Sequence, residues 1–202
     1  MRGKILFGAA LMTTLSGCMM WDAGYTGSRP VTTFAVPRER RVPVTYSITL
    51  AADMEETGGP TEEGLSKRIR EALRATGLYS AISRTGPEAA ADANGHHIAF
   101  EFQKREITGD GAETMQVLSG CTLAAIPAMS YTAFDGKAVV SRQGKAAYAT
   151  VKAEETRTLI WAPALPIGLF MNAWAVWSHV ESGTVNALVN DVAAEHRRAF
   201  FR

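Results

Sequence analysis

The sequence is poor in the residues on which several common protein classes depend. It contains 2 cysteines in 202 residues, which excludes a framework of several disulfides and a cysteine-rich zinc site. Its 21 basic and 20 acidic residues give a formal net charge of +1, so the basic footprint of a nucleic-acid-binding protein is absent. It also lacks an unbroken apolar run of the roughly 20 residues that a transmembrane helix needs. We therefore expect no nucleic acid partner and no spanning helix.

The sequence also contains none of the short motifs that usually mark an active site. There is no Gly-x-Ser-x-Gly elbow, no His-Glu-x-x-His, no phosphate-binding glycine loop and no Gly-x-Gly-x-x-Gly turn. Adjacent side chains on a strand point to opposite faces, so His96 and His97 do not predict a metal site. We therefore predict a non-enzymatic protein without metal or cofactor. The alternative is a hydrolase whose fold brings Ser119 and His97 together with a carboxylate.

The residues that are present organise the chain from its N-terminus. Arg2 and Lys4 are followed by an uncharged stretch, Ile5–Leu15, in the order that is typical of a secretory signal. The stretch ends in Leu15–Cys18, with the sequence Leu-Ser-Gly-Cys. This tetrapeptide resembles the lipobox of bacterial lipoproteins. The resemblance implies that the signal is cleaved before Cys18 and that Cys18 is then acylated with fatty acids.

The lipobox resemblance also implies a location. Residue 19 is Met19 and not aspartate, and the family's sorting rule then places the protein in the outer membrane, facing the periplasm. The implied partner is the membrane itself, through the N-terminal lipid; stable anchoring takes more than one acyl chain, and a lipobox cysteine carries up to three. An inner-membrane location remains as an alternative, in which the chain is a lipoprotein subunit of a transport complex. Lipidation of Cys18 leaves Cys121 without an intramolecular cysteine partner, and we predict that Cys121 is buried as a small apolar residue.

Composition divides the chain into three parts. We assign residues 1–17 to the signal peptide, residues 18–42 to a lipid-anchored linker and residues 43–202 to an α+β periplasmic domain. The linker contains glycine, proline and a cluster of arginines, and its sequence has no sustained helical or strand period. The whole sequence is 47% hydrophobic and 20% charged, and these values predict a packed core rather than disorder.

Periodicity within the domain predicts the main elements. Apolar and polar residues alternate along Val44–Leu50 and again along His96–Phe102, so both stretches are predicted strands. Thr61 is a candidate N-cap for a helix that ends at Gly77. Asp135-Gly136 lies between extended runs and predicts a hairpin turn. The expected fold class is α+β, with two helices packed on one face of a largely antiparallel sheet and an apolar Trp/Pro-rich insertion.

The apolar insertion covers residues 158–180 and carries no formal charge. Its large aromatic residues are the predicted membrane or partner contacts: Trp161, Phe170, Trp174 and Trp177. Pro163 and Pro166 divide the stretch, so a straight membrane-spanning helix is excluded. Two alternatives stay open. The insertion either packs on the domain or lies at the membrane interface beside the lipid anchor.

The last predicted element is a helix with one apolar stripe. The stripe includes Val185, Leu188, Val189, Val192, His196 and Phe200. We predict that His196, near the C-terminal end, is a cation that complements the helix dipole.

The body of the chain, from about Pro43 to Arg202, contains a predicted hairpin between two marked segments. These are the turn at Leu118–Leu123 and the segment Leu159–Phe170. In this arrangement the body resembles small α/β lipoproteins of Gram-negative envelopes, whose best-known members have no assigned activity. The resemblance implies an accessory role in envelope assembly, transport or structure, with an envelope protein as partner.

Overall fold

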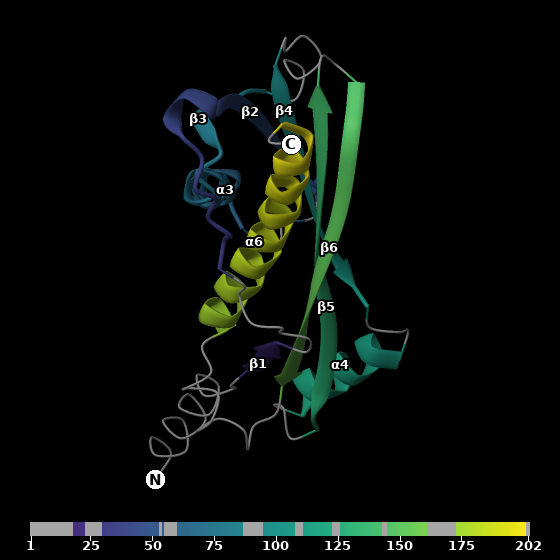
Figure 1. Cartoon of the computed structure of the whole chain (residues 1–202). Helices are drawn as coiled ribbons and strands as arrows, with labels where there is room; N and C mark the ends of the chain where they lie inside the picture. Colours follow the sequence, from purple (N-terminus) through teal and green to yellow (C-terminus); the bar gives the residue numbers. More distant parts are fainter. Residues whose placement is uncertain are drawn as a thin grey trace. The chain divides into compact units, whose positions relative to one another are not determined.

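The structure is a computed structural model that describes residues 18–22, 30–52, 54, 60–86, 95–107, 111–122, 126–142, 145–160 and 173–200. The elements in chain order are β1 (Cys18–Asp22), η1 (Arg38–Arg40), β2 (Val42–Leu50), α3 (Glu62–Ala75), β3 (Tyr79–Arg84), β4 (His96–Glu106), α4 (Gly111–Cys121), β5 (Ala128–Arg142), β6 (Lys145–Ile160) and α6 (Ala173–Phe200) (Figure 1).

The chain divides into two compact units. The larger unit consists of Thr26–Arg105, Phe134–Glu154 and Glu181–Arg202. The smaller unit consists of Met1–Tyr25, Glu106–Ala133 and Glu155–Val180. The strands β4, β5 and β6 and the helix α6 contribute residues to both. We describe each unit by itself.

The sheet of the larger unit has the strand order β3-β2-β4-β5-β6. The strand β2 is parallel to both of its neighbours, β3 and β4. The strands β5 and β6 are joined by two residues, a connection short enough only for antiparallel neighbours. The contact partners of β4 and β5 also run in opposite directions, since Glu101 contacts Lys137 and Gln103 contacts Asp135. The fold is therefore a mixed α/β arrangement in which antiparallel pairing predominates and β2 is the exception.

The core of the larger unit is built on the alternation of β2 and β4. Across these two strands Tyr46 faces Ile98, Ile48 faces Phe100 and Leu50 faces Phe102. Five of these six side chains are buried, namely Tyr46, Ile48, Ile98, Phe100 and Phe102, and Leu50 is half-buried. Both strands were predicted from alternation alone, and the register confirms that the apolar residues of each share one face.

The helix α3 follows the sequence prediction closely. The hydroxyl of Thr61 accepts a hydrogen bond of 3.1 Å from the backbone N–H of Gly64, and so caps the first turn. The helix ends before Gly77, whose φ of 72° is the left-handed conformation that favours glycine. Its inward residues are Leu65, Ile69, Ala72 and Leu73. The hydroxyls of Ser66 and Tyr46 lie 2.8 Å apart, which ties the helix to β2.

The helix α6 is longer than its predicted stripe. It begins at Ala173, so Trp174 and Trp177 belong to it. In the larger unit it is bound to β6, because Asp191 accepts hydrogen bonds from the hydroxyl of Thr150 at 2.8 Å and from the ammonium of Lys152 at 2.9 Å. The stripe residues Val185, Leu188, Val189 and Val192 are buried, as predicted, and the side chain of Phe200 lies outside the described residues.

The hairpin predicted at Asp135-Gly136 is wrong. The strand β5 runs without interruption from Ala128 to Arg142 and includes both residues. A Cβ added to Gly136 would lie 2.7 Å from Cγ2 of Thr184 and 2.8 Å from Cδ1 of Leu188. The glycine therefore lets the helix α6 approach the sheet closely, and it does not serve a turn.

The segment that was expected to be a linker contributes to both units. In the smaller unit β1 pairs antiparallel with the end of β6, from Cys18 opposite Ile160 to Asp22 opposite Thr156. In the larger unit the backbone N–H of Phe34 donates to the carbonyl of Thr76 at 2.8 Å. Nearby, Asn190 of α6 accepts from the N–H of Thr32 and donates to the carbonyl of Pro30. Much of residues 18–42 is therefore bound to the folded units.

The helix α4 of the smaller unit was not predicted. It covers Gly111–Cys121, so the predicted turn at Leu118–Leu123 begins inside a helix. None of the helices that the structure describes is both long enough and apolar enough to cross a membrane.

Candidate functional site

The predicted contact residues are only partly described. The signal peptide, residues 1–17, and the side chains of Trp161 and Phe170 lie outside the described residues. The backbone of Trp174 lies in α6, but its side chain is not described, whereas Trp177 is half-buried on the same helix within the smaller unit. The backbone of Cys18 forms the first residue of β1. Contact of the four aromatic residues with a membrane or partner stays a prediction.

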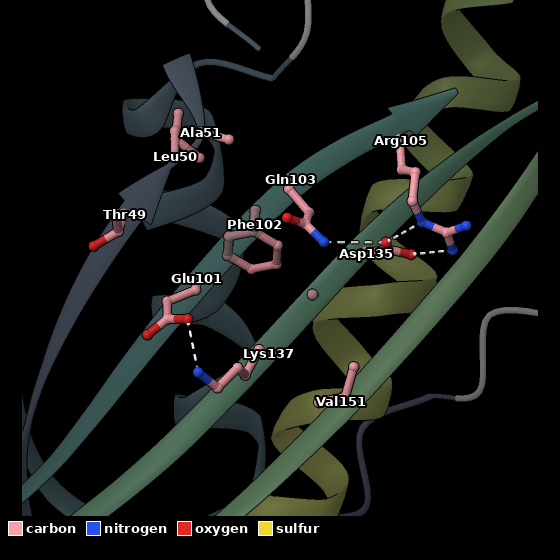
Figure 2. A pocket seen from close by; sticks show the side chains of 11 residues that line it. Thr49, Leu50, Ala51, Glu101, Phe102, Gln103, Arg105, Asp135, Lys137 and Val151 are labelled. Carbon is pink, nitrogen blue, oxygen red and sulfur yellow. Dashed lines mark hydrogen bonds and ion pairs between the residues drawn. The ribbon is translucent and has the colours of Figure 1, made fainter. Parts of the chain in front are cut away.

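One pocket of the larger unit lies over the strands β2, β4, β5 and β6, and we call it the polar groove (Figure 2). Its volume is about 490 Å³. The residues that line it are Thr49, Leu50, Ala51, Glu101, Phe102, Gln103, Arg105, Asp135, Gly136, Lys137 and Val151. Polar positions alternate along β4, so every second side chain of that strand faces the groove.

Two charge pairs cross from β4 to β5 in the polar groove (Figure 2). The guanidinium of Arg105 binds both carboxylate oxygens of Asp135, with Nε 2.9 Å from Oδ2 and Nη2 3.4 Å from Oδ1. The amide of Gln103 also donates to Oδ2 of Asp135, at 3.3 Å. The second pair joins Nζ of Lys137 to Oε2 of Glu101 at 2.9 Å. Each carboxylate of the groove is thus neutralised by a cation.

The groove brings together charged and amide side chains. No serine, cysteine or histidine is among the residues that line the groove. Its two carboxylates each contact a different cation, so they do not share a proton as a catalytic carboxylate dyad does. What the groove offers is a surface of donors and acceptors with balanced charge, held by strands that are rigid on their other face.

His97, the residue on which the hydrolase alternative depends, is engaged elsewhere. Its Nδ1 lies 2.9 Å from the hydroxyl of Thr45, and its Nε2 lies 3.0 Å from the hydroxyl of Ser47. Both His97 and Ser47 are buried, and burial lowers the pKa of His97. The neutral imidazole therefore ties β4 to β2. Ser119 lies in α4 of the smaller unit, where its side chain is also buried.

His196 is a buried core residue and not the exposed cation that we predicted. Its Nδ1 lies 2.8 Å from the hydroxyl of Tyr79, and its ring centroid lies 5.5 Å from that of His96. Burial, reinforced by the charge of His96, lowers the pKa of His196 to about 4. Burial also lowers the pKa of His96, together with the charge of Arg142, and raises the pKa of Tyr79. The helix dipole would favour a cation, but desolvation is the larger effect at this position.

We predict that acid destabilises the larger unit through His196. Its pKa falls from 6.5 in the unfolded chain to about 4 in the folded protein, so the unfolded chain binds more protons between these values. Stability is therefore complete above about pH 6.5 and decreases as the pH falls, by about 3 kcal/mol below pH 4. Urea unfolding at several pH values between 7 and 4 measures this slope.

The variant His196→Gln isolates the contribution of His196, because glutamine can still contact Tyr79 but does not titrate. We expect it to lose the share of the slope that His196 contributes, whereas His96 and His97, whose pKa values burial also lowers, keep theirs in every variant. Glu181 acts in the opposite direction, since burial raises its pKa, but it is present in every variant and cancels in the comparison. Equal slopes in wild type and His196→Gln would contradict the assignment.

Two further expectations from the sequence concern cysteine and metal. Cys121 is exposed on α4, so the prediction that it is buried is wrong. Cys121 lies on the side of the last helical turn that faces solvent.

Among the residues that the structure describes, no group of three histidine, cysteine or acidic side chains is placed to hold a metal ion.

The polar groove was not predicted, although part of its signal is visible in the sequence. Glu101, Gln103 and Arg105 alternate with Phe100 and Phe102, which indicates one polar face on that strand. The partners of these residues on β5 could not be found, because Asp135-Gly136 had been interpreted as a turn. A turn would have placed Asp135 and Lys137 on different strands, away from the groove.

No protein-family model and no curated protein sequence matches the chain. Solved structures do resemble it. A Xanthomonas campestris protein of the DUF330 family is 10% identical, with a TM-score of 0.49 over 87% of this chain and 97% of its own. The lipoprotein B of Nitrosomonas europaea is 12% identical, with a TM-score of 0.43 over 82% and 93%. The rare lipoprotein B of Shewanella oneidensis is 14% identical, with a TM-score of 0.41 over 77% and 98%. At these identities and TM-scores we draw nothing about function from the likeness.

Proposed function

We propose that the protein is an outer-membrane-anchored lipoprotein that faces the periplasm and acts as a non-enzymatic envelope component, binding a partner through the polar groove. The observation that carries the proposal is the tetrapeptide Leu15–Cys18 at the end of a signal sequence. In bacterial lipoproteins this motif marks the cysteine that receives the lipid. The role is accessory, in envelope assembly, transport or structure.

The arrangement of the larger unit supports a binding role for the groove. Tyr46, on the apolar face of β2, contacts Ser66 of α3, and Phe102, on the same face of β4, lies beside Gly136, where α6 approaches. We infer from these contacts that both helices pack on this one face of the sheet. The side chains of Gln103 and Arg105 alternate with Phe102 and emerge on the other face, where they are exposed to solvent. A partner can then reach the groove without displacing a helix.

The predicted membrane or partner contacts of the apolar insertion belong to the same proposal. Trp161, Phe170, Trp174 and Trp177 supply large aromatic side chains in a stretch without formal charge. Tryptophan is enriched at the level of lipid headgroups, where its ring is half in an apolar and half in a polar environment. We propose that these residues contact the membrane interface or an envelope protein near the lipid anchor.

Separation of inner and outer membranes by density tests the location. We expect the lipidated protein in the outer-membrane fraction. Recovery in the inner membrane would contradict the outer-membrane assignment and favour the alternative, a lipoprotein subunit of an inner-membrane transport complex.

A photo-cross-linking side chain at Gln103, in the lipidated protein and in its native membranes, tests the groove. We expect an adduct of discrete mass that is lost when Arg105→Glu and Lys137→Glu reverse the charges beside the label. The matched control is Lys67→Glu, which reverses a charge on the helix α3 outside the groove. An adduct that survives the groove variants, or no adduct at all, would contradict a binding role for this surface.

A further inference from the structure

The helix α4 turns an apolar side outward. Met115, Val117 and Leu118 are 40%, 65% and 43% exposed, and Cys121 is exposed beside them. At 100° per residue these four positions fall within an arc of about 160° of the helix. The exposed Thr114 also falls within this arc, whereas the position of Glu113, the charged residue of the helix, falls about 40° outside it at the same spacing. A helix on a domain surface in water usually shows the reverse, with its apolar stripe toward the core.

The inward side of the same helix is polar. Ser119 is buried, and its hydroxyl has no hydrogen-bond partner among the residues that the structure describes. An unpaired buried hydroxyl costs free energy, whereas an exposed leucine or valine gains nothing from water. An apolar phase against the outward side of α4 would account for this orientation.

Exposed apolar side chains also flank α4 in the same unit. Ile107, at the end of β4, is 39% exposed, and Met129, at the start of β5, is 37% exposed. The backbone N–H of Ile107 donates to the carbonyl of Tyr131 at 2.9 Å, which pairs these two segments. Of the exposed large apolar side chains in the described part of the chain, Val151 alone belongs to the larger unit. The apolar surface is thus a property of the smaller unit.

The smaller unit also contains Cys18, the residue that the proposed function takes to be lipidated. Cys18 is the first residue of β1 and pairs with Ile160 of β6, so the hydrogen-bonded strand starts at the acylated position. No flexible linker separates the acyl chains from the unit. The anchor therefore holds this unit at the bilayer surface, at a high effective concentration relative to lipid.

We propose that the outward side of α4, defined by Met115, Val117, Leu118 and Cys121, inserts into the boundary between headgroups and acyl chains of the membrane that anchors Cys18. The inference rests on the lipidation in the proposed function. Insertion of an uncharged apolar helix side to about 5–10 Å is the usual geometry of interfacial helices. Lipid is favoured over a protein partner because the tether at β1 brings lipid, and not a second protein, to this unit.

Cys121 provides the test. Once Cys18 is acylated, Cys121 is the remaining thiol of the chain, and it lies on the outward side of α4. The lipidated mature protein is labelled there with an environment-sensitive fluorophore and reconstituted into vesicles of phosphatidylethanolamine and phosphatidylglycerol. We expect the label to be quenched several-fold by lipids that carry a shallow spin label and to be protected from aqueous iodide.

Paired variants supply the controls. Val117→Asp places a charge in the proposed membrane contact, and we expect it to restore access of iodide to the label. Ala149→Asp places the same charge at an exposed position of β6 in the larger unit, outside the polar groove, and we expect no effect. Co-sedimentation of the same samples with vesicles reports the lipid anchor separately. Protein that sediments with its label still open to iodide would overturn the contact but leave the anchor intact. Protection in native membranes but not in lipid vesicles would overturn it in favour of a protein partner.

Discussion

Replacing Cys18 by serine is expected to leave the precursor uncleaved and unacylated. The thiol of the lipobox cysteine is the acceptor of the diacylglycerol, and cleavage follows acylation in the proteins that the signal resembles. Serine is close to cysteine in size, and β1 pairs through its backbone, so the substitution removes the chemistry without altering the strand. Labelling with an alkyne analogue of palmitate, read together with the electrophoretic mobility of the precursor, measures both steps.

The matched control is Cys121→Ser, which removes the other thiol of the chain at an exposed position. We expect it to be labelled and processed like the wild type. Labelling that persists in Cys18→Ser and disappears in Cys121→Ser would transfer the lipid to the second cysteine. Cleavage of Cys18→Ser at the wild-type position, without label, would indicate an ordinary secretory signal and remove the basis for a lipoprotein.

Elements whose structure depends on neighbouring residues along the chain could be predicted from the sequence. The alternation of Val44–Leu50 places apolar residues on one face whichever strand lies beside it, and the N-cap at Thr61 and the glycine at Gly77 fix both ends of α3. These features depend on neighbours within a few residues. The same holds for the buried stripe of α6, whose period is visible without knowledge of the sheet.

Features that depend on contacts between residues far apart in the chain were predicted wrongly from the local sequence. Asp135-Gly136 satisfies the local pattern of a turn, yet Gly136 is required by Thr184 and Leu188, more than forty residues away along the chain. His196 satisfies the local pattern of a cation near a helix C-terminus, but Tyr79 and His96 enclose it. Tertiary packing outweighs the local preference in both cases.

The helix α4 was missed for a different reason. Its apolar residues Met115, Val117 and Leu118 follow no inward stripe, and Gly120 interrupts the pattern near its end. Sequence periodicity finds helices that hide their apolar side from water. A helix that turns its apolar side outward does not show the inward apolar stripe by which helices are predicted. The outward apolar side of α4 could therefore be seen only from the exposure of its side chains in the structure.

Replacing Phe102 by alanine is expected to lower the free energy of unfolding of the larger unit by about 3–5 kcal/mol. The ring of Phe102 is buried between two others, with centroids 6.3 Å from Phe100 and 5.5 Å from Phe134, and both pairs are stacked. It also lies beside Gly136, where α6 meets the sheet. Truncation removes the ring contacts and leaves a cavity that neighbouring strands cannot fill, since their backbones are held by the ladder. Urea unfolding followed by far-UV circular dichroism measures the loss.

Two variants on the same strand make the result specific to the core. Gln103→Ala changes the next residue, whose side chain faces the polar groove, and we expect a change of about 0.5 kcal/mol or less. Phe102→Leu keeps most of the buried volume and should fall between Phe102→Ala and the wild type. Since a whole domain is stable by only about 5–15 kcal/mol, Phe102→Ala should remove a large part of the total. If Phe102→Ala and Gln103→Ala prove equally mild, the aromatic stack does not carry the docking of α6 on the sheet.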